Sequence, residues 1–259
     1  MSHAGTTRYP VVPGALSDWA VMFRRALRRS VRGRDTLLIS LLLPILLMLL
    51  FVYVFGGAIE VGMRYIDYVV PGIMLLCTGF GASITATGVA TDIRSGAVDR
   101  FRTLPIHRQA LLTGHAVEGV VRNLAVIGVL VAVAVLLGFR PHAGIGAALA
   151  AAGIIALFVL AITWIAVSMG LLARMPEAAG GFTYAIMFIP YISSAFVRTE
   201  TMPSWLRGFA DHQPATPVLT AIRGLLTGTP QHTAGLAVLW CAGLAAVGYV
   251  ASAVLFARR

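Results

Sequence analysis

The sequence predicts an all-α integral membrane protein with six transmembrane helices, and two observations carry this prediction. Hydrophobic residues make up 58% of the 259 residues and charged residues only 12%, whereas a soluble domain carries about 25% charged residues. The apolar residues also lie in long runs rather than in amphipathic stripes, and a helix that crosses a bilayer needs about 20 such residues. One membrane domain therefore accounts for most of the chain.

Six apolar runs are long enough to cross a bilayer. They comprise residues 37–55, 66–90, 111–137, 145–172, 178–196 and 233–256. We therefore expect residues 36–259 to form one transmembrane domain. Two hydrophilic segments between the runs, residues 91–110 and residues 198–232, are long enough to carry structure of their own.

Residues 1–35 are expected to form a cytoplasmic tail that ends in an amphipathic helix. Apolar residues recur there at every fourth position, namely Trp19, Phe23, Leu27 and Val31. Arginines occupy the other face of the predicted helix. Such a helix lies in the membrane interface, with its arginines towards anionic headgroups. The alternative is an ordinary basic flank that only sets the topology.

All 20 basic residues are arginine, and their distribution predicts the orientation of the chain. If the N-terminus is cytoplasmic, 14 arginines fall on the cytoplasmic side and 5 on the other, with Arg122 inside a run. Cytoplasmic loops of membrane proteins carry the excess of positive charge. Both termini are therefore expected in the cytoplasm, in a multi-pass protein of the plasma membrane.

The second run carries small residues at every fourth position, namely Thr78, Ala82, Ala86 and Ala90. Small residues let helices approach closely, so this helix is expected at the centre of the bundle or at an interface between protomers. Helix packing is the simpler interpretation of the pattern, and a substrate path is the alternative.

The sequence indicates no enzymatic site. It contains no lysine, and a Walker phosphate loop requires one. Neither the spacing of a metal site nor that of a catalytic motif is present, and Cys77 and Cys241 are interpreted as packing residues inside apolar runs. The arginines flank membrane runs rather than an aromatic groove, which argues against nucleic acid binding. We therefore predict no catalytic residue, metal site or cofactor in this chain.

A polar cluster lies inside the membrane near the start of the third run: His115, Glu118, Arg122 and Asn123. Glu118 and Arg122 are four residues apart, in the order that favours an ion pair within a helix. Because charge in a membrane helix is costly, the cluster should face protein or a wet cavity. It is either a structural ion pair or a polar lining of a pathway, and Glu118 could also serve as the ion site of a secondary transporter.

The segment 91–110 alternates acidic and basic residues around Gly96, and Pro105 would terminate a short helix over residues 97–103. A charged helix between two membrane runs is more elaborate than a simple turn. Asp99, Arg100 and Arg102 would face the cytoplasm. We therefore expect this segment to be a docking element for another protein.

The same segment resembles the cytoplasmic segment of type-2 ABC transporter permeases. The matching residues are Asp92, Gly96, Asp99, Arg100 and Pro105. The late part of the chain is similar to daunorubicin-resistance permeases of that family, over residues 190–197, 201–207, 214–217 and 223–228. With the basic N-terminal helix and the six runs, the resemblance covers nearly the whole chain.

This resemblance implies a permease that does no covalent chemistry itself. Two ATPase subunits, which bind ATP and Mg, would dock beneath two permease subunits, the second being a copy or a paralogue. The residues implied to couple to the ATPase are Asp92, Gly96, Asp99, Arg100, Arg102 and Pro105. The segment 198–232 would fold as short external helices.

The resemblance also implies export of a hydrophobic or amphipathic drug, antibiotic or lipid out of the cytoplasm or the inner leaflet. Two alternatives come from the residues themselves. One is an ion-coupled secondary transporter that uses Glu118, and the other is a membrane anchor for an enzyme complex.

Overall fold

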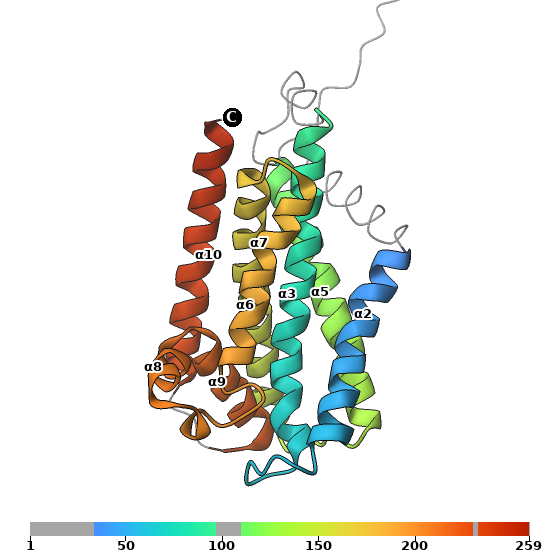
Figure 1. Ribbon diagram of the computed structural model, residues 1–259, viewed down its shortest axis with the longest axis vertical. Helices are drawn as coiled ribbons and strands as arrows, with labels where there is room; N and C mark the ends of the chain where they lie inside the picture. Colours follow the sequence, from blue (N-terminus) through green and yellow to red (C-terminus); the bar gives the residue numbers. More distant parts are fainter. Residues whose placement is uncertain (1–33, 97–109, 230–232, 259) are drawn as a thin grey trace, which may run out of the picture.

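The computed structural model describes residues 34–96, 110–229 and 233–258, and these residues form a bundle of long helices that run up and down (Figure 1). No strand occurs within these three ranges. The elements of the bundle are α2 (Arg34–Leu49), its π-helical continuation η1 (Leu50–Phe55), α3 (Tyr65–Arg94), α5 (Ala110–Leu136), α6 (Ile145–Leu172), α7 (Pro176–Phe188) and α10 (Ala234–Ala257). Two 3₁₀ turns, η2 (Ile189–Ile192) and η3 (Thr199–Thr201), and two short helices, α8 (Ser204–His212) and α9 (Ala215–Thr227), lie between α7 and α10.

The first described helix begins, and the last one ends, at the same end of the bundle (Figure 1). The opposite end carries α8 and α9, in the segment that the sequence predicts to fold as short external helices. Within the described ranges, four helices are long and apolar enough to cross a membrane, namely α3, α5, α6 and α10. The continuous apolar helix of α2 and η1 and the helix α7 are shorter, so the count of six spans stays a prediction.

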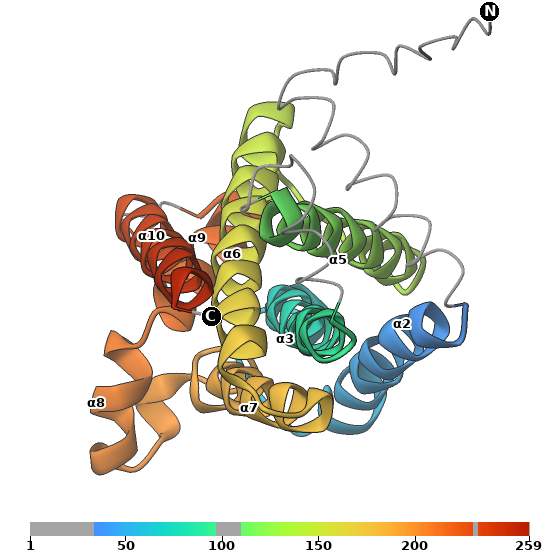
Figure 2. The same cartoon turned by 90° about the horizontal axis from the view of Figure 1, so that it is seen from above.

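α3 occupies the centre of the bundle, with α2, α5, α6 and α7 around it (Figure 2). Its most apolar stretch is largely buried inside the protein. Thr78, Ala82 and Ala86 are all almost inaccessible, so the small residues of this helix are packing positions, as the sequence predicts. This finding confirms the central place of the second apolar run.

The fifth predicted span, over residues 178–196, is wrong in its second half. The α-helix α7 ends at Phe188 and is followed by the 3₁₀ turn η2. Pro190 lies in that turn and has no backbone N–H with which to continue an α-helical ladder. The apolar run continues beyond this residue, but the α-helix does not. The prediction was wrong because hydropathy does not report the lost hydrogen bond.

α10 packs on α6 at a point where the two backbones nearly touch. The Ser168 hydroxyl on α6 donates to the Gly248 carbonyl on α10 at 2.8 Å. A Cβ atom at Gly248 would lie 2.8 Å from the Ile165 nitrogen and 2.9 Å from the Trp164 carbonyl carbon. The ring of Trp164 also meets Tyr249 edge to face, with centroids 5.0 Å apart. A residue without a side chain is therefore required at the crossing.

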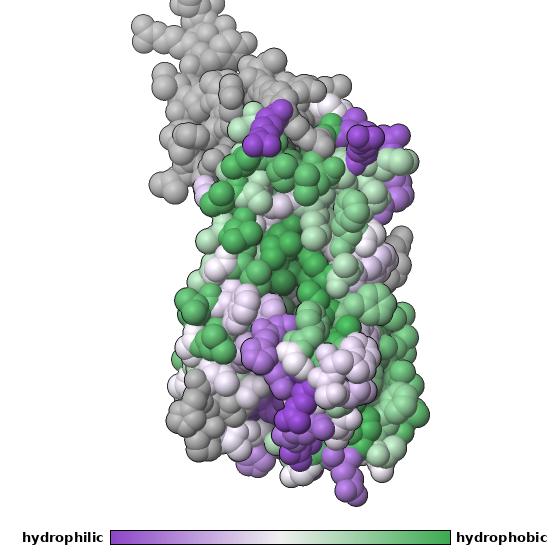
Figure 3. All heavy atoms as spheres, turned by 60° about the vertical axis from the view of Figure 1, so that its left-hand side comes forward, coloured by the Kyte–Doolittle hydropathy of each residue, from purple (hydrophilic) through white to green (hydrophobic). Residues whose placement is uncertain are grey.

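On the face that Figure 3 shows, the surface of the bundle is mostly apolar between hydrophilic residues at its two ends. Large apolar side chains point outward from several helices, among them Leu42, Leu46, Leu239 and Val247. A soluble protein rarely exposes a continuous apolar belt of this kind. The surface is that of a protein whose middle lies in a bilayer.

We expect the substitution Gly248→Ala to destabilise the protein by about 1–3 kcal/mol, because the added methyl group collides with backbone atoms that cannot rotate away. The matched control is Gly243→Ala on the same helix, where nothing lies within 4 Å of the new Cβ atom. That control should leave stability unchanged or raise it by up to about 1 kcal/mol, because alanine is the better helix former. Thermal unfolding in detergent measures both, and equal unfolding temperatures for the two variants would contradict the crossing.

The predicted orientation can be tested with single cysteines introduced at Gly5, His107 and Gly208 in a chain whose Cys77 and Cys241 are replaced by alanine. A membrane-impermeant maleimide should label position 208 in intact cells, since residue 208 lies on exposed α8. The other two positions should react only after permeabilisation. The reverse pattern would place both termini outside.

Candidate functional site

A buried polar seam joins α3 to α5 at the cluster that the sequence singles out. Arg122 on α5 lies 2.5 Å from the Glu118 carboxylate, one turn earlier. Its other terminal nitrogen donates to the Gly81 carbonyl at 3.1 Å and to the Thr85 hydroxyl at 2.8 Å, both on α3. Glu118 and Arg122 are only 5% and 7% exposed. The Arg122 guanidinium therefore neutralises the Glu118 carboxylate on its own helix and also binds the neighbouring helix α3.

Asn123 packs directly on the backbone of α3 beside this ion pair. A Cβ atom at Gly81 would lie only 1.8 Å from the Asn123 side-chain oxygen, so no larger residue fits at position 81. The Arg122 Nε and Asn123 Nδ2 atoms are buried and have no hydrogen-bond partner within the described part of the chain. A buried donor without a partner costs about 1–3 kcal/mol. The seam therefore carries a local energetic cost along with the ion pair.

Asp92 and His115 extend the seam towards the end of the bundle where α3 ends. His115 Nε2 on α5 lies 3.0 Å from Asp92 Oδ2 on α3, and Asp92 is 7% exposed. α3 ends at Arg94, and Gly96, two residues later, has a φ of +67°, a left-handed conformation that favours glycine. The segment 91–110 is thus anchored to α5 at its first residues, by a carboxylate that points into the bundle rather than into solvent.

The other residues implied to couple to an ATPase lie outside the described residues, so their role stays a prediction. These are Asp99, Arg100, Arg102 and Pro105. For the polar cluster, the structure brings all four members to the α3–α5 contact: Glu118 and Arg122 as an ion pair, His115 against Asp92, and Asn123 as a packed amide.

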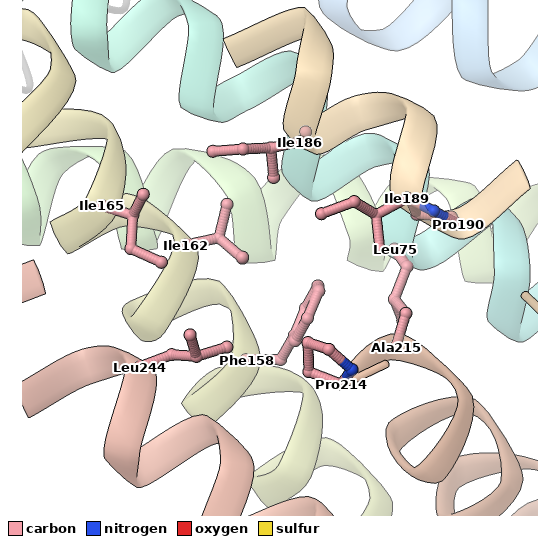
Figure 4. Close-up of a pocket in the computed structure, with 11 residues that line it drawn as sticks. Leu75, Phe158, Ile162, Ile165, Ile186, Ile189, Pro190, Pro214, Ala215 and Leu244 are labelled. Carbon is pink, nitrogen blue, oxygen red and sulfur yellow. The ribbon is translucent and has the colours of Figure 1, made fainter. Parts of the chain in front are cut away.

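An apolar pocket lies on the other side of α3, between six elements of the bundle (Figure 4). It spans about 550 Å³, open solvent at its mouth included. The lining residues are Leu75 and Gly79 from α3, Phe158, Ile162 and Ile165 from α6, Ile186 from α7, Ile189 and Pro190 from η2, Pro214 and Ala215 at the start of α9, and Leu244 from α10. None of these side chains carries a charge or a hydrogen-bonding group.

The seam and the pocket use different faces of the same helix. Gly79 lines the pocket and Gly81 lies under Asn123. Two residues in an α-helix are about 200° apart around its axis, so these positions face in nearly opposite directions. His115, Glu118, Arg122 and Asn123 are absent from the lining of the pocket. The polar cluster therefore forms no part of the wall of this pocket.

Reasoning from the sequence missed this pocket. Its lining comes from six elements, and in the local sequence each lining residue resembles an ordinary residue of a membrane helix. The one signal that could have pointed to it is the pair Pro190 and Pro214, which interrupt helices near the end of the bundle that carries α8 and α9 and supply part of the pocket wall.

Comparison with known proteins decides the family. The profile of the ABC-2 type transporter family matches residues 17–227. The chain belongs to this family. It is therefore a multi-pass membrane protein of the permease type, in which ATP hydrolysis belongs to a separate subunit.

Two relatives of this ABC-2 permease carry names that concern drug resistance. The daunorubicin resistance ABC transporter permease protein DrrB1 of Streptomyces coeruleorubidus is 33% identical over 209 residues, which cover 80% of this chain and 74% of the relative. The probable doxorubicin resistance ABC transporter permease protein DrrC of Mycobacterium tuberculosis is 26% identical over 237 residues, which cover 90% of this chain and 86% of the relative. The predicted family resemblance is thereby confirmed, and so is the all-α membrane fold.

We expect the single substitutions Glu118→Gln and Arg122→Gln to destabilise this permease by about 3–5 kcal/mol each, because either one leaves a buried charge without its partner. The double substitution should cost much less than the sum of the two, since it removes both charges together. Detergent-solubilised protein would be compared by thermal unfolding and by the fraction that elutes as a single species. Strictly additive losses would mean that the two groups do not interact.

Proposed function

We propose that the chain is the transmembrane subunit of an ABC exporter for a hydrophobic or amphipathic compound, such as a drug, an antibiotic or a lipid. It would move this compound out of the cytoplasm or the inner leaflet of the plasma membrane. Two copies of a separate ATPase subunit would bind ATP and Mg and supply the energy. A second permease, either another copy of this chain or a paralogue, would complete the transporter.

The apolar pocket is the observation that carries the proposal. Binding cavities for small molecules are lined mainly by apolar residues, and every side chain that lines this pocket is apolar. A cavity without polar side chains offers a ligand no side-chain hydrogen bonds, so it selects compounds with a large apolar part.

The polar seam makes the ion-coupled alternative less suitable. An ion-coupled carrier needs a carboxylate that can exchange its ion during transport. Glu118 lies against the guanidinium of Arg122, and neither group borders the pocket. Thr85 and the Gly81 carbonyl hold Arg122 in place. This arrangement favours a structural role for the pair.

Energy would reach the pocket through a shift between two arrangements of the permease pair. A nucleotide state of the ATPase changes the population of these arrangements only if it binds one of them better than the other. The segment 91–110 would make that contact, and its anchor between Asp92 and His115 would pass the movement to α3 and α5 together.

The function can be tested in proteoliposomes that contain the chain together with an ABC ATPase that co-purifies with it. Fluorescent daunorubicin is the probe, since a relative is named for resistance to it. ATP should drive its movement across the membrane, and the movement should stop when the Walker lysine of the ATPase is replaced. A chain that forms no complex with any ATPase, or one that assembles with an enzyme instead, would support the membrane-anchor alternative.

The coupling role of segment 91–110 yields a separate prediction. The double substitution Asp99→Ala, Arg100→Ala should leave membrane insertion normal but weaken the ATPase complex. Loss of charged contacts at an interface typically costs about 2–5 kcal/mol, which corresponds to at least about 30-fold in affinity. Co-purification and substrate-stimulated ATP hydrolysis measure the effect.

The matched control replaces an acid–arginine pair at the opposite end of the bundle. Arg207 and Asp211 lie 3.6 Å apart on exposed α8. Their double alanine variant removes the same two charge types but should leave both the complex and the stimulated hydrolysis unchanged. If the Asp99, Arg100 variant behaves like this control, the segment is an ordinary solvated loop.

A further inference from the structure

The pocket has a half-buried rim that faces outward from the bundle. Phe158 and Ile162 at its base are buried, whereas Ile165, Ile186 and Leu244 are only partly covered. Ile165 belongs to α6, Ile186 to α7 and Leu244 to α10, and α7 and α10 both pack on α6. The space-filling view shows an apolar hollow on this side of the molecule, above the hydrophilic external end (Figure 3).

The side chains next to this rim are also apolar and exposed. Phe182 and Phe188 on α7 are 52% and 58% exposed, and Val247 on α10 is 64% exposed. Exposed aromatic and aliphatic side chains on these helices are expected at the depth of lipid tails rather than of water. The rim therefore opens towards the hydrocarbon layer.

At the external end, by contrast, the pocket is closed by turns that are held by hydrogen bonds. Pro190 and Pro214 form part of this wall. Arg223 on α9 donates to the Ser194 carbonyl at 2.8 Å and to the Tyr68 carbonyl at 3.1 Å, and its guanidinium lies over the Tyr68 ring. These contacts tie α9 and the turn after η2 to α3. These hydrogen-bonded turns therefore block entry of a ligand from water on the external side.

The lining restricts what can occupy the pocket. A polar or charged group placed there would lose its hydrogen bonds to water and gain none from the side chains of the eleven lining residues, which are all apolar or, at Gly79, absent. An aliphatic chain or a fused-ring system loses no hydrogen bonds on burial. The occupant must therefore present an apolar group and keep its polar part outside the pocket.

We propose that this pocket binds the apolar part of an amphipathic molecule that reaches it sideways from the bilayer, through the gap between α7 and α10. The proposal rests on the exporter function and deepens it, because it assigns the loading site and the chemistry that the site recognises. Leu244 and Ile186 form the two sides of the opening, and Phe158 and Ile162 form its base.

The test uses the full chain in lipid vesicles and a palmitic acid analogue that carries a diazirine at the end of its chain. Illumination should attach the probe to the pocket segments of α6, α7 and α10, identified by mass spectrometry of the peptides. Neither ATP nor the ATPase is needed, so the outcome is independent of whether the chain works as an ABC exporter.

Two variants narrow the opening from opposite sides, Leu244→Trp on α10 and Ile186→Trp on α7. Each should lower labelling of the α6 base by about tenfold, which corresponds to about 1.4 kcal/mol of lost binding. The matched control is Leu239→Trp, which adds the same ring to α10 at a position that is 69% exposed and outside the pocket. Its labelling should equal that of the unmodified chain, and the unfolding temperatures of all three variants verify that they fold.

Competition with the daunorubicin aglycone separates two sources of the apolar group. Loss of labelling in its presence identifies a drug-like ring system, and persistence of labelling identifies a lipid tail. Both results agree with the proposal. The proposal would be overturned if the probe did not label the α6 base, or if both tryptophan variants were labelled there as strongly as the unmodified chain.

A second copy of the chain could instead cover the opening. Cysteines at Ile186 and Leu244 would then form a disulfide-linked dimer in high yield, and the fatty acid probe would not reach α6. That pair of results would also overturn the proposal, while leaving the exporter function untouched.

Discussion

The architecture depends on how closely other helices can approach α3. In a bilayer, helices gain little by hiding apolar surface from lipid, so close packing and hydrogen bonds between helices must stabilise the bundle. α3 meets this requirement with residues that have little or no side chain. Gly79 brings the α7 backbone at Met187 into contact, and Gly81 brings the amide of Asn123 on α5 into contact. Bulkier residues at these two positions would separate the central helix from both neighbours.

Because of its central position, the single helix α3 takes part in three features of the structure. One face forms the polar seam with Arg122, another lines the apolar pocket through Leu75, and the end that carries Asp92 begins the segment proposed to meet the ATPase. In the proposed exporter, movement of that end would reach the pocket through a continuous helix. The buried pair of Asp92 and His115 would make α5 move with it.

Much of the fold could be predicted from local patterns. Long apolar runs indicate membrane helices, and four of them were confirmed as helices of sufficient length. The spacing of Glu118 and Arg122 predicts their ion pair, because residues four apart in a helix are neighbours whatever surrounds them. The pattern failed at α7, where Pro190 ends the helix inside an apolar run. Hydropathy measures burial in lipid and does not count backbone hydrogen bonds.

By itself the sequence determined the membrane environment and the residues that must escape lipid, because both follow from composition or from short-range spacing, and its similarity to known permeases determined the family. Only the tertiary structure decided which groups those residues meet. Arg122 contacts Thr85, 37 positions away in the chain, Asp92 contacts His115, 23 positions away, and side chains from six elements line the pocket. Such contacts depend on the rotation and separation of packed helices. These are set by close approach at glycines such as Gly81 and Gly248, and no local pattern of residues encodes which helix will lie there.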